Sequence, residues 1–196
     1  MVNLSDKKIL VIGAHADDIE YSVGGLILYS NDVTGLIVTD NKDRKHEVLQ
    51  SSSILGYDPI FLDLEETNVD LNSLICLVEQ YIKNIKPDII LTHYTDDTHQ
   101  DHRATSQAVI SACRDYKGLI AFFYSPSTIN FLPNIFVGLT DGDFQIKLDA
   151  IKCHKSQLDK PFLNDNSIES VFKYWGTTFR QNGKYHEPLK LYRAAL

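Results

Sequence analysis

The chain has 196 residues, of which 43% are hydrophobic and 23% are charged, a composition typical of an ordinary globular protein. A chain of this length can bury a core without disulfides or a structural metal. Its formal net charge of −7 argues against a general nucleic-acid-binding protein, which would need a basic surface, and equally against binding to an anionic membrane surface.

The three cysteines, Cys76, Cys113 and Cys153, lie far apart and form no CxxC pair. This pattern is typical of buried thiols in a reducing compartment. The polar first eight residues lead directly into a strand-like run, so we expect no signal peptide. No apolar run approaches the roughly 20 residues that a membrane helix needs. We therefore expect a cytoplasmic protein with no membrane insertion and no nucleic-acid partner.

Short apolar runs alternate with helix-like segments along the first 125 residues. In chain order, the pattern predicts strand 8–13, helix 17–30, strand 32–40, helix 44–55, strand 59–64, helix 70–85, strand 88–93, helix 102–116 and strand 119–125. These strands are apolar along their whole length, which indicates a parallel sheet covered on both faces.

The pattern is looser beyond residue 125. There it predicts a strand over 131–139, helices over 143–157 and 168–181, and a last strand over 188–193. No repeat, low-complexity tract or linker interrupts the chain. The sequence therefore predicts an α/β fold, a three-layer α/β/α sandwich with a mostly parallel, Rossmann-like sheet, in one domain over residues 1–196.

Two loops carry most of the chemically reactive side chains, and each follows an expected strand. Residues 13–20 read GAHADDIE, and residues 95–103 read TDDTHQDHR. In open α/β sheets, ligands bind at the carboxyl ends of the strands, near a switch in strand order. The two loops together hold three histidines and five aspartates. Carboxylates this crowded repel one another unless a cation neutralises them, so we expect a bound divalent metal.

Catalytic zinc usually takes three protein ligands and leaves one position for water. His15, Asp18 and His102 would supply two imidazoles and one carboxylate. The metal would acidify a water molecule, and Asp17 would accept its proton as the water attacks an amide carbonyl. Because Asp17 and Asp18 are neighbours, the pattern alone does not assign their roles. An aspartate pair at a helix start also fits a simple helix cap.

The second loop offers two further groups for such a reaction. His99 is placed to stabilise the oxyanion or to protonate the leaving amine. Asp101 could hold the His99 ring in one tautomer.

The same segments resemble a known family. The stretch VIGAHADDIEYSVGG resembles the AHPDDxE signature of the PIG-L/LmbE-like N-acetylglucosaminyl deacetylases, and THQDHR resembles the second metal motif of that family, HPDH. The segment from Arg44 to Glu47 resembles the arginine-containing helix of the family, and PSTINFLPNIFVG, residues 154–157 and YHEPLKLYRA resemble its C-terminal part. The resemblance thus runs from Lys8 nearly to the end of the chain.

The resemblance implies a zinc-dependent hydrolase that removes an acetyl group from an N-acetylated, sugar-like small molecule. It implies roles for seven residues: the zinc ligands His15, Asp18 and His102, the general base Asp17, the electrostatic or acid partner His99, its bracing residue Asp101, and the substrate-binding residue Arg44. The ligand set would also accept Fe²⁺ or Mn²⁺. The exact substrate stays open, and the resemblance also admits a homo-oligomer.

The chain departs from the family pattern at three positions. Ala16 and Gln100 replace the prolines of the two motifs, which supply no ligand. Asp97 stands where some relatives have a tyrosine, so any help from a tyrosine to the oxyanion would come from elsewhere, with Tyr94 as one candidate. Glu20, the last residue of the first motif, is expected to bond to nearby backbone at the helix start.

Two questions stay open, one about the place of a single histidine and one about the function of the protein. His154 either lines the rim of the site or packs within a helix. The main alternative to the deacetylase is a metal-binding α/β protein that is not catalytic or catalyses a different reaction. Asp17 favours catalysis, because a site that only binds metal needs no spare base.

Overall fold

The computed structural model describes residues 4–39, 42–181 and 184–194. The elements follow one another in this order: β1 (Lys8–Gly13), α1 (Asp18–Ile27), β2 (Asp32–Thr39), the 3₁₀ turn η1 (Lys42–Arg44), α2 (Lys45–Leu55), β3 (Asp58–Leu64), α3 (Leu71–Ile85), β4 (Ile89–His93), α4 (Gln100–Ala112), β5 (Leu119–Phe123), β6 (Ile135–Leu139), α5 (Asp141–Ile151), the 3₁₀ turns η2 (Lys155–Gln157) and η3 (Pro161–Leu163), α6 (Asp165–Thr178) and β7 (Tyr185–Arg193).

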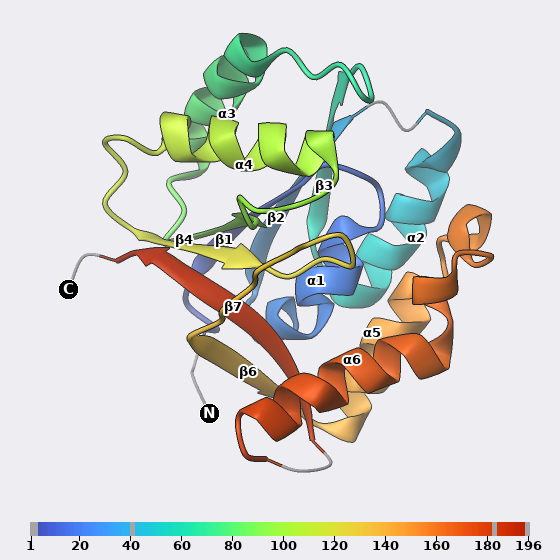
Figure 1. Cartoon of the computed structure of the whole chain (residues 1–196). Coiled ribbons are helices and arrows are strands. Elements are labelled where there is room, and N and C mark those ends of the chain that lie inside the picture. Colours follow the sequence, from blue (N-terminus) through green and yellow to red (C-terminus); the bar gives the residue numbers. More distant parts are fainter. Residues whose placement is uncertain (1–3, 40–41, 182–183, 195–196) are drawn as a thin grey trace.

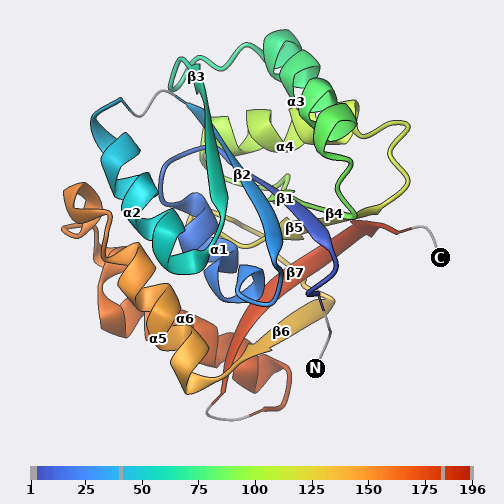
Figure 2. The ribbon, with the colours of Figure 1, turned by 180° about the vertical axis from the view of Figure 1, so that it is seen from behind.

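The seven strands hydrogen-bond into one sheet in the order β3-β2-β1-β4-β5-β7-β6. The five strands from β3 to β5 are parallel, whereas β7 runs antiparallel to both β5 and β6. The helices α3 and α4 cover one face, and α1, α2, α5 and α6 lie on the other (Figure 1). The opposite view shows the same layers from behind (Figure 2). The predicted α/β sandwich with a mostly parallel sheet is thus confirmed.

Both faces of the central strands are apolar, which is why two helical layers form. Ile9 and Val11 pack on the side of α1, and Leu10 and Ile12 pack on the side of α3 and α4. All four side chains are buried. Successive side chains of a strand point to opposite faces, so a continuous apolar run such as β1 fits a sheet that is covered on both sides.

Local sequence signals set the end of α2 and both ends of α3 at the residues that the sequence predicts. Gly56 adopts the left-handed conformation, with φ of 76°, and closes α2. The Asp70 carboxylate accepts a hydrogen bond from the Ser73 N–H and begins α3. Lys86, also left-handed, ends that helix directly before Pro87, which cannot continue it.

Several helix boundaries differ from the prediction: α1 ends at Ile27 and not at residue 30, and α6 covers Asp165–Thr178 and not 168–181. The helix α4 begins at Gln100, two residues earlier than expected, because His99 already occupies its N-cap position. The helix α5 covers Asp141–Ile151 and not 143–157, since Thr140 and Asp143 form a capping box that starts it early. The rest of the expected helix is the separate turn η2.

All three cysteines are free thiols, but the expectation that they are buried is correct only for Cys113, since Cys76 is exposed and Cys153 is half-buried. In the described part of the chain, no helix combines the length and the apolar character that crossing a membrane requires.

Candidate metal centre

The loops after β1 and β4 meet at the carboxyl edge of the sheet. The two strands are direct neighbours, with Ile12 opposite Thr92. The order of strands also reverses here, because the chain moves outward from β1 to β3 and then returns to β4. Within the first loop, Gly13 lets the Asp18 side chain lie close to the backbone, because a Cβ atom added at Gly13 would be only 3.1 Å from the Cβ atom of Asp18. The fold thus brings the two reactive loops together.

The three side chains expected to bind metal converge at this point. His15 Nδ1 lies 3.2 Å from His102 Nε2 and 3.4 Å from the Asp18 carboxylate, and His102 Nε2 lies 3.5 Å from that carboxylate. Two ligand atoms that are each ~2.0–2.1 Å from a tetrahedral zinc lie roughly 3.3 Å apart. The donor atoms and their spacing therefore fit a zinc ion.

Buried negative charge around the two rings favours their cationic forms. Burial alone would lower the pKa of His15, but the Asp101 and Asp18 carboxylates raise it to about 10. Burial likewise opposes the charged form of His102, whereas Asp18 and Asp97 raise its pKa to about 9. When they are protonated, the two rings place positive charge beside these carboxylates, and a bound divalent cation would do the same. The electrostatics of the site therefore also favour a metal cation.

The Asp101 carboxylate does not take the partner that the sequence predicts. It contacts His15 Nε2 at 3.2 Å and accepts a hydrogen bond from the Thr67 N–H at 3.0 Å. His99 meets only the main chain of Asp101, whose N–H donates to His99 Nδ1. The expected bracing of the His99 ring by this carboxylate is therefore replaced by bracing of His15. Helix geometry explains the difference, since His99 caps α4 and Asp101 lies in its first turn.

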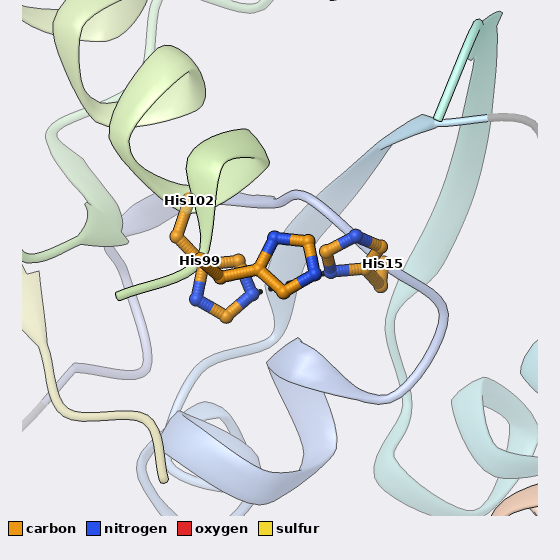
Figure 3. A group of neighbouring side chains, drawn as sticks. All are labelled: His15, His99 and His102. Carbon is orange, nitrogen blue, oxygen red and sulfur yellow. Dashed lines mark hydrogen bonds between the residues drawn. The ribbon is translucent and has the colours of Figure 1, made fainter. Parts of the chain in front are cut away.

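Two further histidines surround the same point. Figure 3 shows the rings of His15, His99 and His102 gathered between the loop after β1 and the first turn of α4. One donor atom from each of these three rings lies within 4.8 Å of the others. Asp18, His93 and His102 form a second such group. Candidate donors for a metal thus outnumber the three that were predicted.

His93 is the residue that sequence reasoning missed. It is fully buried at the end of β4, its Nε2 lies 3.1 Å from the Asp18 carboxylate, and its ring stacks on that of His102. The Ala14 N–H also donates a hydrogen bond to His93 Nε2, with 3.0 Å between the two nitrogens. This hydrogen bond occupies the lone pair that a metal would need. Burial lowers the pKa of His93 to about 4, so a neutral ring is favoured. The available signal in the sequence was a histidine at the end of a strand, directly before the second reactive loop.

Asp17 lies beside the cluster, at the N-cap position of α1. Within the described chain its side chain makes no capping hydrogen bond, so the simple cap interpretation does not account for it. Its carboxylate lies 3.3 Å from Arg44 Nη2, and Arg44 Nε lies 3.5 Å from Glu47. Arg44 is therefore held between two carboxylates beside the cluster, and its role in substrate binding stays a prediction.

A cavity of about 520 Å³ opens over these residues. This volume lies in the range of small-molecule sites, which is about 300–1,000 Å³. Its floor includes His15, Asp17, Asp18 and His102, and its wall is completed by Tyr21, Asp43, Arg44, Glu66, His99, Pro126, Ser127, Gln157, Lys160, Phe162 and Leu163. The reactive groups thus face a space large enough for a sugar-sized ligand.

Glu20 and His154 form a buried support behind the cavity. Glu20 is fully buried and accepts hydrogen bonds from Ser51 Oγ and from the Tyr57 hydroxyl at 2.6 Å. His154 Nε2 lies 3.5 Å from the same carboxylate. The expectation that Glu20 bonds to nearby backbone is therefore wrong, because its partners come from distant elements. His154 is likewise fully buried rather than on the rim.

Taken together, fold and site define an α/β protein with a histidine–aspartate centre of the metal-binding type at the switch point of its sheet. Residues 10–113 match the family model described as PIG-L, GlcNAc-PI de-N-acetylase. The uncharacterized deacetylase YaiS of Escherichia coli strain K12 is 35% identical over 169 residues, which cover 76% of this chain and 91% of YaiS. The chain belongs to the PIG-L/LmbE-like deacetylase family.

Solved structures share the fold at low sequence identity. The conserved protein TT1542 of Thermus thermophilus has a TM-score of 0.80 and 21% identity, over 97% of this chain and 96% of TT1542. The 4-carboxy-2-hydroxymuconate hydratase GalB of Pseudomonas putida KT2440 has a TM-score of 0.79 and 18% identity, over 97% and 98%. The zinc-inhibited form of the teicoplanin deacetylase Orf2 has a TM-score of 0.71 and 15% identity, over 96% and 100%. Deacetylases and a hydratase share this fold, so the activity must be argued from the site.

Proposed function

We propose that this protein is a metal-dependent hydrolase that removes the acetyl group from an N-acetylated sugar or sugar conjugate. The observation that carries the proposal is the convergence of His15, Asp18 and His102 within 3.5 Å of one another, with Asp17 beside them on the floor of the cavity. Family membership and the likeness to a deacetylase support the acetyl amide as the bond that is cleaved.

In this proposal His15, Asp18 and His102 would hold a zinc ion, for which Fe²⁺ or Mn²⁺ are alternatives. The ion would acidify a water molecule and polarise the acetyl carbonyl. Asp17 accepts a proton from that water as its oxygen attacks the carbonyl carbon. The carbon–nitrogen bond then breaks, the proton passes to the leaving nitrogen, and the products are acetate and a free amine.

His99 suits the oxyanion role better than the acid role. Burial and the neighbouring His15 and His102 lower its pKa, which favours a neutral ring. Its Nδ1 accepts the Asp101 N–H, so the proton of the neutral ring lies on Nε2. His99 thus offers an N–H donor to an oxygen that becomes negative in the transition state.

Arg44 gives a first test of substrate binding. Its Nε and Nη2 atoms are buried and have no hydrogen-bond acceptor among the described residues, although Asp17 and Glu47 neutralise its charge. Arg44 nevertheless lines the cavity, so its side chain can contact a substrate that binds there. We expect Arg44→Ala to lower kcat/KM about 10-fold or more, mostly through KM, with little change in Tm.

The matched control for this variant is Lys45→Ala. Lys45 is the next basic residue, and its ion pair with Asp63 lies at the surface. Exposed pairs of this kind contribute about 0–1 kcal/mol, so kinetics and Tm should both stay close to those of the parent protein. An unchanged kcat/KM in Arg44→Ala together with a lower Tm would show that Arg44 only supports the fold.

The proposed activity is tested by a screen for acetate release. The purified, zinc-loaded protein is incubated with N-acetylglucosamine, its glycosides and its lipid-, nucleotide- and thiol-linked conjugates, with N-acetyl-lysine as the non-sugar amide. Metal content is measured on the same sample. We expect one acetate per free amine from at least one sugar conjugate, at a rate well above that for N-acetyl-lysine. Release of acetate from N-acetyl-lysine alone, or from no compound, would contradict the proposal.

A further inference from the structure

The carboxylate of Asp97 contacts the proposed ligand His102, and Asp97 is not among the residues that line the cavity. Asp97 precedes α4 and is only 3% exposed. Its backbone pairs with Thr128 in an isolated bridge, which ties the loop after β4 to the loop after β5. Arg103 Nη1 also donates to the Asp97 carbonyl oxygen. Both the main chain and the side chain of Asp97 are therefore held in place.

The Asp97 carboxylate is held by donors on both of its oxygens. Oδ1 accepts the His99 N–H at 2.7 Å. Oδ2 accepts the hydroxyls of Ser125 at 2.9 Å and Thr128 at 3.1 Å. An ionised carboxylate can only accept hydrogen bonds. Any ring nitrogen that bonds to it must therefore carry a proton.

That ring nitrogen is His102 Nδ1, which lies 3.1 Å from Asp97 Oδ2 and also 3.1 Å from Ser127 Oγ, a hydroxyl oxygen that can accept the same proton. The other ring nitrogen, Nε2, faces His15 Nδ1 and the Asp18 carboxylate. A neutral imidazole with its proton on one nitrogen carries its lone pair on the other. The contact with Asp97 thus leaves the lone pair of His102 on the atom that points at the cluster.

We propose that Asp97 is a positioning residue that holds the proton of His102 on Nδ1 and so presents Nε2 to the metal. The inference rests on the metal site of the proposed function. Carboxylates in this position orient the imidazole and raise its basicity as a ligand, and their loss typically weakens metal binding by about 10–100-fold.

The test is the affinity of the metal-free protein for zinc alone, measured by competition with a chromophoric chelator. We expect Asp97→Asn to raise the zinc Kd by about 10–100-fold. The matched control is Asp96→Asn, which removes the same charge one residue away, where the carboxylate accepts a hydrogen bond from the exposed Asn130 amide. Screening by solvent should keep that change below about threefold.

The outcomes separate this inference from the proposed function. Equal zinc affinity in Asp97→Asn and Asp96→Asn would overturn the role of Asp97 and leave the metal site intact. Failure of the parent protein to bind zinc would overturn both. If Asp97→Asn does not fold, the proposal is tested on the zinc-loaded parent protein by long-range ¹H–¹⁵N correlation NMR. We expect the His102 proton on Nδ1. A proton on Nε2 would overturn the proposal.

Discussion

Asp17→Asn is expected to lower kcat for acetate release by about 10²–10⁴-fold while the protein keeps one zinc per chain. An amide cannot take a proton from the attacking water, but it fills nearly the same space as the carboxylate. Asp17 is half-buried and lies beside the convergent ligands, where its carboxylate forms an ion pair with Arg44. The loss should therefore appear in kcat, with the metal content unchanged.

The control is the same substitution at the next residue. Asp18 accepts the His15 N–H at 2.7 Å and lies between both proposed histidine ligands, so Asp18→Asn should weaken zinc binding as well as turnover. Loss of zinc in Asp17→Asn with zinc retained in Asp18→Asn would exchange the two roles. Full turnover in Asp17→Asn would refute the hydrolytic mechanism.

The second large effect concerns a buried ion pair outside the cavity. Lys147 and Glu187 are both fully buried, and Lys147 Nζ lies 2.5 Å from the Glu187 carboxylate. The helix α1 is broken at Val23, and Glu187 accepts the N–H groups of Gly25 and Leu26 that follow the break, each at 2.7 Å. Glu187 thus caps the second half of α1.

Lys147→Met is expected to lower the free energy of unfolding by about 3–5 kcal/mol, because it leaves the Glu187 charge buried without its cation. Urea denaturation measures the change. The matched control is Lys152→Met at the end of the same helix, where the ion pair with Asp165 is exposed and should contribute about 0–1 kcal/mol. A cost for Lys147→Met as small as that for Lys152→Met would show that the buried pair contributes little.

The fold was largely predictable because its signals are local. The strand β1 and the end of α2 at Gly56 lie where the apolar run and the glycine predict them. The start of α4 was not found, because His99 is an unusual cap and its role depends on the site around it. This boundary was missed because His99 serves the site and the helix at once, whereas that of α5 was missed because the capping box at Thr140 and Asp143 was overlooked.

The sequence predicted that three candidate ligands gather at one point, but it missed His93 and most of the contacts around them. The two motifs identify His15, Asp18 and His102, and parallel strands bring the loops together. The partners of Glu20 come from the end of α2 and the start of β3, and the partner of Asp101 is on the loop after β1. These contacts depend on tertiary packing, and the spacing of residues along the chain does not predict them.

A zinc titration of the metal-free protein, with acetate release from an N-acetylated sugar conjugate as the readout, tests the proposed metal-dependent hydrolysis directly. We expect no turnover without metal and a rate that rises until one zinc per chain is bound at His15, Asp18 and His102. Full acetate release before zinc is added, or none at any zinc concentration, would contradict the proposal.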